Sequence, residues 1–308
     1  MRIGILGIGD LATKAYLPVL SQMADVELVL CTRNPLTLEQ VKKQYRIHES
    51  YTDLHAFLES GLEGVFIAAA TRAHVTLAKM AIAAGIPVHL DKPIAANYDD
   101  CLELEQFSLR AGVPCFIGFN RRFVPAIQPL IREEKPSMVL YRKNRRMDLT
   151  DLETMLFDDF IHVIDTARYL LHDESVEGLA SALLTQDQKF SGVALTLKST
   201  TSYAQCIMKY TNGIDEEIID VFFDHMNYTV RDLNQTIRYE ANQQIETKQN
   251  DWVPTLTKRG FQAMCEAFLD SLRQRPSASI AISDALVSHR IANDALLQLR
   301  KKGPFAND

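Results

Sequence analysis

The sequence predicts an α/β protein with two domains, the first built on a parallel sheet and the second an α+β domain with an open, mainly antiparallel sheet. The chain has 308 residues, which is too long for one ordinary hydrophobic core. Short apolar runs alternate with helical patterns over the first 120 residues, as in a parallel sheet covered by helices on both faces. Beyond that point strand patterns follow one another with period two, which favours antiparallel pairing.

The first domain is expected to span residues 1–119. Near-continuous apolar runs predict its buried strands at 2–8, 26–32, 64–70, 87–90 and 114–119. Helical periodicity occupies the segments between them, near 11–23, 36–44, 72–84 and 97–111. Gly85 and Gly112 follow the last two helices, at the position where a helix commonly ends in the left-handed conformation.

The second domain is expected to span residues 120–308, with the boundary near Asn120. After an opening helix, alternating segments predict strands within 137–147, 178–185, 192–210, 217–232 and 236–242. Two further helices are predicted near the end of the chain, at 257–273 and 283–301. An open sheet with an apolar face requires cover, so we expect a homodimer or a higher homo-oligomer.

Composition argues against several kinds of partner. The formal net charge of −6 argues against a nucleic acid or an anionic membrane as the main partner. No apolar stretch approaches the roughly 18 residues that a membrane span requires, and no cleavable-signal layout is expected. Five scattered cysteines without a C-x-x-C pair suit a reducing compartment and no thiolate metal site. We therefore expect a cytoplasmic, metal-independent protein.

The segment ILGIGDLA carries a G-x-G-x-x-A motif at Gly7, Gly9 and Ala12, directly after a predicted strand and at the start of a helix. Gly7 permits a tight turn, Gly9 leaves room for a pyrophosphate, and Ala12 lets the helix pack closely. With Asp10 and Leu11 between them, these residues predict the cofactor loop of a Rossmann domain. The alternative is a plain glycine turn.

The end of the second predicted strand indicates which dinucleotide the domain prefers. An NAD site typically carries an acidic residue there to hold the ribose hydroxyls, whereas this strand ends in Thr32 and Arg33. Arg33 is suited to pair with a 2′-phosphate, so the sequence favours NADP(H) over NAD(H). The alternative is a solvated arginine on a loop.

A lysine in a restricted turn is the first candidate for catalysis. Asp91-Lys92-Pro93 follows the strand at 87–90, and catalytic groups of open α/β sheets gather at the carboxyl ends of strands. Pro93 bars Lys92 from the helical region and so restricts the direction of its side chain. Taken alone, such a turn is more commonly a surface loop.

The apolar segment LFDDFIHVIDTARYLL, residues 156–171, carries a line of polar residues. At helical spacing Asp158, His162 and Asp165 lie on one narrow stripe. Charged groups that leave water without a partner destabilise the fold strongly. The stripe is therefore either a satisfied polar seam or the lining of a functional cleft.

Taken together, these motifs resemble the Gfo/Idh/MocA family of oxidoreductases, and most closely its MviM branch. The resemblance covers the whole chain. It depends on the glycine motif, on EGVFIAAATRAHVTLAKMAIAAGIPVHLDKP at 63–93, on GFNRRFVP at 118–125, and on Asp158 with His162. One residue departs from the family pattern D-x-G-x-H: Phe160 stands in place of the glycine. We expect Phe160 to narrow the site or to reposition the substrate.

The resemblance implies a Rossmann domain followed by an α/β domain, in an enzyme that uses NAD(H) or NADP(H) on sugars, polyols or related small molecules. It assigns a lysine, an aspartate and a histidine to the reaction, and these are Lys92, Asp158 and His162 here. Further cofactor contacts are expected from Thr32, Arg33, Thr71, His74, Asp91 and Lys92.

The expected reaction interconverts a secondary alcohol and a ketone by hydride transfer, in a site between the domains. The imidazole of His162 suits proton exchange near neutral pH, and Lys92 stabilises negative charge on the substrate oxygen. Asp165 either fixes the tautomer of this histidine or makes a structural hydrogen bond. The remaining candidates for contact with the substrate, or between the domains, are Asn120, Arg121, Arg122 and Asp165.

Two alternatives belong to other functional classes. The first is a catalytically silent regulator or scaffold that binds NADP(H), which the unusual Phe160 favours. The second is a hydrolysis or elimination that proceeds through transient oxidation. The cationic run YRKNRRM at 141–147 is either a solvated face or a surface for an anionic substrate.

Overall fold

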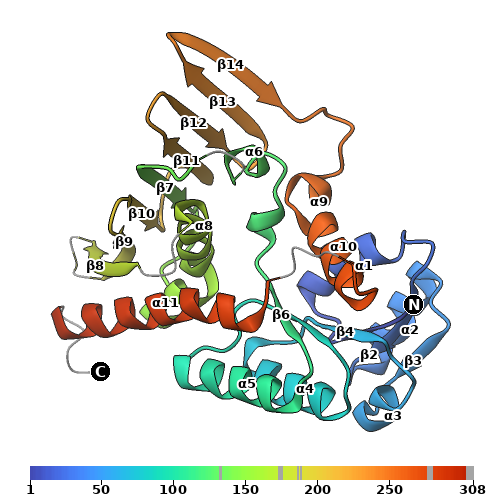
Figure 1. The fold of residues 1–308 in the computed structure, drawn as a ribbon. Helices are drawn as coiled ribbons and strands as arrows, with labels where there is room; N and C mark the ends of the chain where they lie inside the picture. The colour runs from blue at the N-terminus through green and yellow to red at the C-terminus, as the bar shows by residue number, and fades with distance from the viewer. Residues whose placement is uncertain (132–133, 173–175, 186, 188, 276–279, 303–308) are drawn as a thin grey trace. The chain divides into compact units, whose positions relative to one another are not determined.

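The computed structural model describes residues 1–131, 134–172, 176–185, 187, 189–275 and 280–302 (Figure 1). The chain forms two compact units and passes from the first to the second at Phe119 and Asn120. The first unit contains residues 1–119 and 261–286. The second contains residues 120–260 and the chain from residue 287 onward.

The segment 261–286 belongs to the first unit, whereas the sequence predicts it in the second. Apolar packing explains the difference. Phe268 of α10 (Phe261–Leu272) is fully buried, and its ring centroid lies 4.9 Å from that of Phe66. The backbone N–H of Ile117 also donates to the carbonyl of Ile280 at 2.9 Å, so the chain after α10 follows the edge of the sheet.

The first unit is built on a six-stranded parallel sheet with the order β3-β2-β1-β4-β5-β6, the order of a Rossmann domain. Its strands are β1 (Arg2–Leu6), β2 (Glu27–Cys31), β3 (Glu49–Tyr51), β4 (Gly64–Ile67), β5 (Val88–Asp91) and β6 (Cys115–Gly118). Its helices are η1 (Ala12–Tyr16), α1 (Leu17–Leu20), α2 (Pro35–Tyr45), α3 (Leu54–Leu58), α4 (Thr71–Ala83), α5 (Tyr98–Ala111) and α10. The predicted parallel sheet is confirmed.

Capping residues explain where the helices of this unit begin and end. The Asn34 side chain accepts from the N–H groups of Leu36 and Thr37 at the start of α2, and satisfies donors that the helix leaves unpaired. Asn97 does the same at the start of α5. Gly112 ends α5 in the left-handed conformation, with a φ of 65°, as the sequence predicts.

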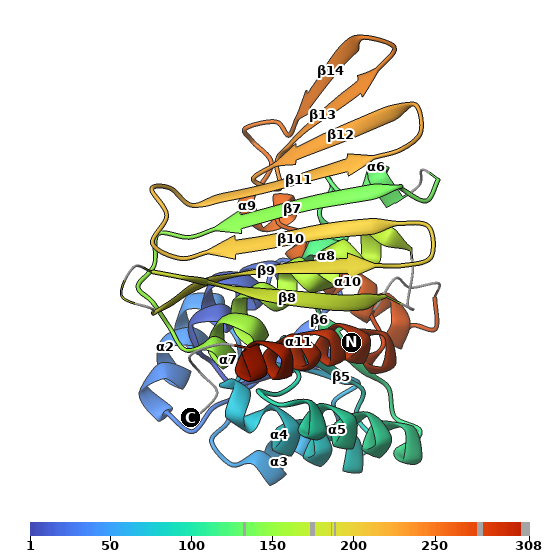
Figure 2. The same cartoon turned by 90° about the vertical axis from the view of Figure 1, so that its left-hand side faces the viewer.

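The second unit is built on an eight-stranded sheet with the order β14-β13-β12-β11-β7-β10-β9-β8, which Figure 2 shows from edge to edge. Strands β7 and β10 pair in parallel, and the other pairs are antiparallel. The strands are β7 (Met138–Asn144), β8 (Glu177–Leu184), β9 (Phe190–Lys198), β10 (Tyr203–Lys209), β11 (Glu216–Phe222), β12 (Met226–Arg231), β13 (Gln235–Glu240) and β14 (Gln243–Lys248). The predicted mainly antiparallel sheet is confirmed.

The helices of the second unit lie outside the sheet, and α8 covers part of one of its faces. They are η2 (Asn120–Phe123), α6 (Gln128–Ile131), α7 (Leu152–Thr154), η3 (Met155–Phe160), α8 (Ile161–Leu171), α9 (Thr255–Lys258) and, from residue 287 onward, α11 (Ile282–Lys302). α8 packs against β7 and β10, and its apolar residues join one core with inward-facing residues of the strands. Among the described residues, no helix is both long and apolar enough to cross a bilayer.

Candidate active site

The glycine loop has the geometry that its motif requires. Gly7 has a φ of +89°, and a Cβ there would lie 2.7 Å from the backbone of Ala69, so a larger residue would be strained and crowded. A Cβ on Gly9 would meet only the carbonyl oxygen of Ala68, at 3.9 Å, and would otherwise point into open space. The backbone beside Gly9 is therefore accessible to a group as large as a pyrophosphate, and the loop fits a dinucleotide.

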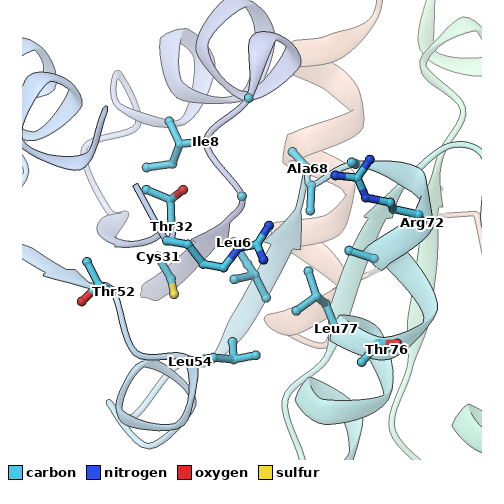
Figure 3. Close-up of a pocket in the computed structure, with 16 residues that line it drawn as sticks. Leu6, Ile8, Cys31, Thr32, Thr52, Leu54, Ala68, Arg72, Thr76 and Leu77 are labelled. Atoms are coloured by element: carbon cyan, nitrogen blue, oxygen red, sulfur yellow. The ribbon is translucent and has the colours of Figure 1, made fainter. Parts of the chain in front are cut away.

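A pocket of about 560 Å³ opens beside this loop. Four residues predicted to bind the cofactor line it, namely Gly7, Gly9, Thr32 and Arg33. In Figure 3, Thr32 and Cys31 border the pocket from the end of β2, and Arg72 reaches toward it from the start of α4. The sequence prediction missed Arg72 and the neighbouring pocket residues Thr52, Leu54, Thr76 and Leu77.

Three predicted cofactor residues near the loop lie outside the pocket lining. Asp10 is exposed, and its carboxylate accepts from the ammonium of Lys14 at 2.7 Å. Leu11 is half-buried, directly before η1. Ala12 is fully buried, which agrees with the close helix packing that the motif predicts. These residues shape the loop and the helix after it rather than the walls of the pocket.

His74 and Thr71 also lie outside the pocket lining. The imidazole of His74 is 1% exposed; its Nδ1 lies 2.8 Å from the carbonyl oxygen of Pro93 and its Nε2 lies 3.0 Å from that of Ala69. The expectation that His74 contacts the cofactor is therefore corrected. It is a buried link between the loop after β4 and the turn that carries Lys92.

Lys92 follows the last residue of β5, at the carboxyl end of the strand, as the sequence predicts. Its side chain is half-buried, and its peptide bond to Pro93 is cis. The preceding Asp91 is buried and accepts a hydrogen bond of 2.9 Å from the Tyr16 hydroxyl. Burial raises the pKa of Asp91, although the positive charge of Lys92 opposes the shift. Asp91 thus links the turn that carries Lys92 to Tyr16 of η1.

The polar stripe of residues 156–171 is helical but not uniform. Its first part, η3, is a π-helix, and α8 continues from Ile161. Exposure falls along the stripe: Asp158 is exposed, His162 is 9% exposed, and Asp165 is 0% exposed. Asp158 is the exposed member of the stripe, His162 is largely buried, and Asp165 belongs to the interior.

The predicted contacts of Asp165 and Arg122 with substrate are corrected, because the two residues pair with each other. Arg122 donates from Nε and Nη2 to the two carboxylate oxygens of Asp165, at 2.9 and 2.6 Å. The hydroxyl of Ser288 donates to the same carboxylate at 2.8 Å. Asp165 therefore makes the structural hydrogen bonds that were its alternative role, and these contacts occupy both of its oxygens.

Arg121 and Asn120 are likewise buried structural residues. Arg121 donates from Nε and Nη2 to Glu217 of β11, at 2.6 and 3.0 Å, and both side chains are 6% exposed. The amide of Asn120 donates to the carbonyl oxygen of Arg259 at 2.8 Å. The three polar residues that open the second unit therefore hold it together, and the expectation that they contact substrate is corrected.

Phe160 is fully buried in the hydrophobic core of the second unit, together with Phe157 and Leu156 of the same π-helix. It therefore packs inward, so the structure does not support the expectation that its side chain narrows the site. Its large side chain anchors the turn that carries Asp158.

The cationic run 141–147 divides between solvent and interior. The Arg142 side chain is 49% exposed, as expected of a solvated face, whereas Lys143 is 1% exposed. Burial lowers the pKa of Lys143 to about 7, with the charge of Arg121 acting in the same direction and Asp159 opposing it. The period-two pattern contains the signal for this, since Lys143 lies on the same face as Val139 and Tyr141. Among the described residues, no group of three or more His, Cys, Asp or Glu could hold a metal ion.

Comparison with known proteins identifies the family. Residues 1–119 match the family model of the Gfo/Idh/MocA oxidoreductases, with an NAD-binding Rossmann fold, and residues 132–242 match that of the YceM-like C-terminal domain. The YceM protein of Salmonella typhimurium is 30% identical over 94% of this chain and 95% of its own length. The chain therefore belongs to the Gfo/Idh/MocA oxidoreductase family, as the sequence motifs predict.

Two further proteins extend the comparison. The MviM dehydrogenase of Clostridium difficile has a solved structure that superposes with a TM-score of 0.90, at 24% identity, over 97% of this chain and 99% of its own. That likeness shows the same fold through both units. Myo-inositol 2-dehydrogenase of Thermotoga maritima is 25% identical over 61% of this chain and 60% of its own length.

Proposed function

We propose that the protein is an NADP(H)-preferring oxidoreductase that interconverts a secondary alcohol and a ketone on a sugar, a polyol or a related small molecule. The observation that carries the proposal is the pocket beside the glycine loop. Arg33 and Arg72 both line it, and none of its sixteen described lining residues is acidic. Two cations without a carboxylate favour the extra phosphate of NADP(H) over the ribose hydroxyls of NAD(H).

The chain's own residues supply proton transfer and charge stabilisation in this proposal. A bound nicotinamide ring supplies the hydride acceptor or donor. The ammonium of Lys92 stabilises negative charge on the reacting oxygen and holds that oxygen in place. The imidazole of His162 takes the hydroxyl proton in oxidation and returns it in reduction, since its ordinary pKa lies near neutrality. Asp158, exposed one turn before it, holds a substrate hydroxyl.

A polyol or sugar is the substrate class that the relatives favour, because one of them is named a myo-inositol dehydrogenase. The site chemistry agrees, since a half-buried ammonium, a carboxylate and an imidazole all hydrogen-bond to hydroxyl groups. The silent regulator or scaffold loses part of its support, because the side chain of Phe160 lies in the hydrophobic core.

Turnover with a panel of substrates tests the proposal. The purified protein would be mixed with NADP⁺ and, separately, myo-inositol, other inositols, aldoses and ketoses, and absorbance at 340 nm would be followed. We expect at least one substrate to be oxidised, and Lys92→Met to slow the oxidation roughly 10²–10³-fold while the affinity for NADPH is retained. Silence across the panel together with tight NADPH binding would favour the regulator. Product formation without net NADPH would indicate transient oxidation.

Self-association and a reducing compartment complete the proposal. On the face of the second sheet opposite Val139 and Ile219, apolar side chains such as Leu140, Ile207 and Ile218 remain partly exposed. A second copy of the chain that covers this face would remove apolar surface from water, so we propose a homodimer or a higher homo-oligomer.

All five cysteines are free and buried, which suits the cytoplasm. Mass photometry at two concentrations tests the assembly.

A further inference from the structure

Two buried side chains from neighbouring strands contact one residue of the π-helix η3. Lys143, near the end of β7, donates from Nζ to the backbone carbonyl oxygen of Asp159 at 3.0 Å and lies 3.4 Å from its carboxylate. Tyr210 directly follows β10 and donates its hydroxyl to the other carboxylate oxygen of Asp159 at 2.5 Å. Lys143 and Tyr210 are each 1% exposed. The main chain and the side chain of Asp159 are thus both held.

The sheet brings these two groups to the same place. β7 and β10 run side by side in parallel, with Lys143 opposite Met208 and Asn144 opposite Lys209. Tyr210 follows Lys209 in the sequence. Its backbone N–H donates to the carbonyl oxygen of Ser191 at 2.9 Å, which fixes its position beside β9. Both donors therefore come from the ends of two paired inner strands of the eight-stranded sheet.

The residue that they hold lies in an irregular part of the helix. A π-helix is rare, and its short segments commonly occur at functional sites. On one side of η3, Leu156, Phe157 and Phe160 anchor the turn in the hydrophobic core. On the other side, the contacts of Asp159 with the sheet anchor it through polar groups. Asp158 lies between these two anchors with its side chain exposed.

We propose that Lys143 and Tyr210 are positioning residues for the reaction: by holding Asp159 they fix the π-helical turn that presents Asp158 and leads into His162. This inference rests on the proposed function for the roles of Asp158 and His162. It adds two residues from the interior of the sheet that do not themselves contact substrate. The ammonium and the hydroxyl replace the water that would otherwise solvate Asp159, so that carboxylate is removed from competition for the substrate.

The charges around Lys143 agree with this role. Glu217 lies directly opposite it on β11, and the carboxylate of Glu217 is 2.6 Å from Arg121 and 4.0 Å from Arg145. Glu217 is already paired with Arg121, and Lys143 donates instead to Asp159. Loss of the ammonium would leave a buried peptide carbonyl and a half-buried carboxylate with one donor fewer.

Hydrogen exchange and turnover together test the proposal. Tyr210→Phe removes one oxygen and keeps the ring, and Lys143→Met removes the charge and keeps an unbranched side chain of similar length. Their matched controls are Tyr203→Phe on β10, whose exposed hydroxyl bonds Gln205, and Arg142→Met, the exposed neighbour on β7. We expect amides of residues 155–162 to exchange about tenfold faster in the two test variants and to be unchanged in the controls.

The kinetic arm separates positioning from general stability. On any substrate that the panel identifies, we expect kcat to fall about tenfold or more in Tyr210→Phe, with the Kd for NADPH and the thermal midpoint little changed. Unchanged exchange in both test variants would overturn the inference, whatever the turnover. Faster exchange with an unchanged kcat would also overturn it, because the turn would then not govern the reaction. If the wild type turned over no substrate, the proposed function would fail, while the exchange result would still decide whether Lys143 and Tyr210 fix the turn.

Discussion

Arg122 and Asp165, 43 residues apart in the chain, form a buried ion pair with two hydrogen bonds of 2.9 and 2.6 Å. Burial alone would raise the pKa of Asp165, but the Arg122 guanidinium overcomes this and holds the pKa below its ordinary value. The ring of Tyr169 also faces the guanidinium, at 4.8 Å from its centroid. This pair ties the start of the second unit to α8, the helix that carries His162.

Removing one partner of this pair is expected to destabilise the second unit strongly. Asp165→Asn would leave the Arg122 charge buried and poorly compensated, and we expect the free energy of unfolding to fall by about 3–5 kcal/mol. Urea denaturation followed by circular dichroism measures it. The control is Asp294→Asn, whose exposed carboxylate lies 3.7 Å from Arg290 and contributes little. Equal losses in the two variants would contradict the assignment.

Much of the fold could be predicted because apolar runs and periodicity record burial directly. The strands that escaped prediction lack that record: β3 has three partly buried residues, and every residue of β14 is exposed. The position of α10 could not be predicted either. Its apolar face indicates that it is buried, but Phe268 packs against Phe66, which lies 202 positions earlier in the sequence.

The site was predictable where its chemistry is local. Short motifs indicate that Gly7 and Gly9 form a turn, where they line the pocket, and that Lys92 follows the end of a strand. Charged residues were misread where their meaning depends on a distant partner. Arg121 pairs with Glu217, which lies 96 positions later in the chain. From the sequence alone, such a charged residue resembles a group that binds substrate. Arg72 was missed because the sequence alone does not indicate that the start of α4 lines the pocket.

Phe160 offers a test of its packing role. Because it is fully buried in the core, Phe160→Ala should leave a cavity and lower the free energy of unfolding by about 3–5 kcal/mol. The more conservative Phe160→Leu should cost less, since it fills most of the space. Denaturant unfolding of both variants checks the order. A variant with unchanged stability and an altered substrate range would instead restore Phe160 to the site.

The choice of cofactor can be tested through the two pocket arginines. Arg33→Ala and Arg72→Ala should each raise the Kd for NADPH by roughly tenfold or more, because each loses a charge-assisted contact with phosphate. The Kd for NADH should change much less. Fluorescence titration of each variant with both dinucleotides measures the ratio. If the two dinucleotides lost affinity equally, the arginines would serve the shared part of the cofactor, and the NADP(H) preference would be refuted.

Acid sensitivity should follow from Glu217. Burial favours its neutral form, but Arg121 and Lys143 lower its pKa from 4.5 to about 2. A pKa lowered in the folded state stabilises the protein fully above about 4.5, and this stabilisation is lost as pH falls toward 2. We expect it to be on the order of 3 kcal/mol at neutral pH. The stability gap between wild type and Glu217→Gln, measured by urea unfolding, should therefore narrow below pH 4.5. A gap that is the same at pH 3 and pH 7 would contradict the ionised pair.

Lys92 and His162 should affect turnover in different ways. Lys92→Met removes charge stabilisation of the reacting oxygen, so kcat should fall roughly 10²–10³-fold at every pH. His162→Gln removes the group that exchanges the proton, so kcat should fall roughly 10²–10⁴-fold, and the limb of the pH profile near neutrality should disappear. His172→Gln, at the end of α8, is the matched control and should leave both measurements unchanged.

Since neither test residue lines the pocket beside the glycine loop, the Kd for NADPH should stay within about twofold in both variants. Full-rate turnover by His162→Gln with the wild-type pH profile would require another proton carrier, and Asp158, one turn earlier on the same helical segment, would be the first residue to test.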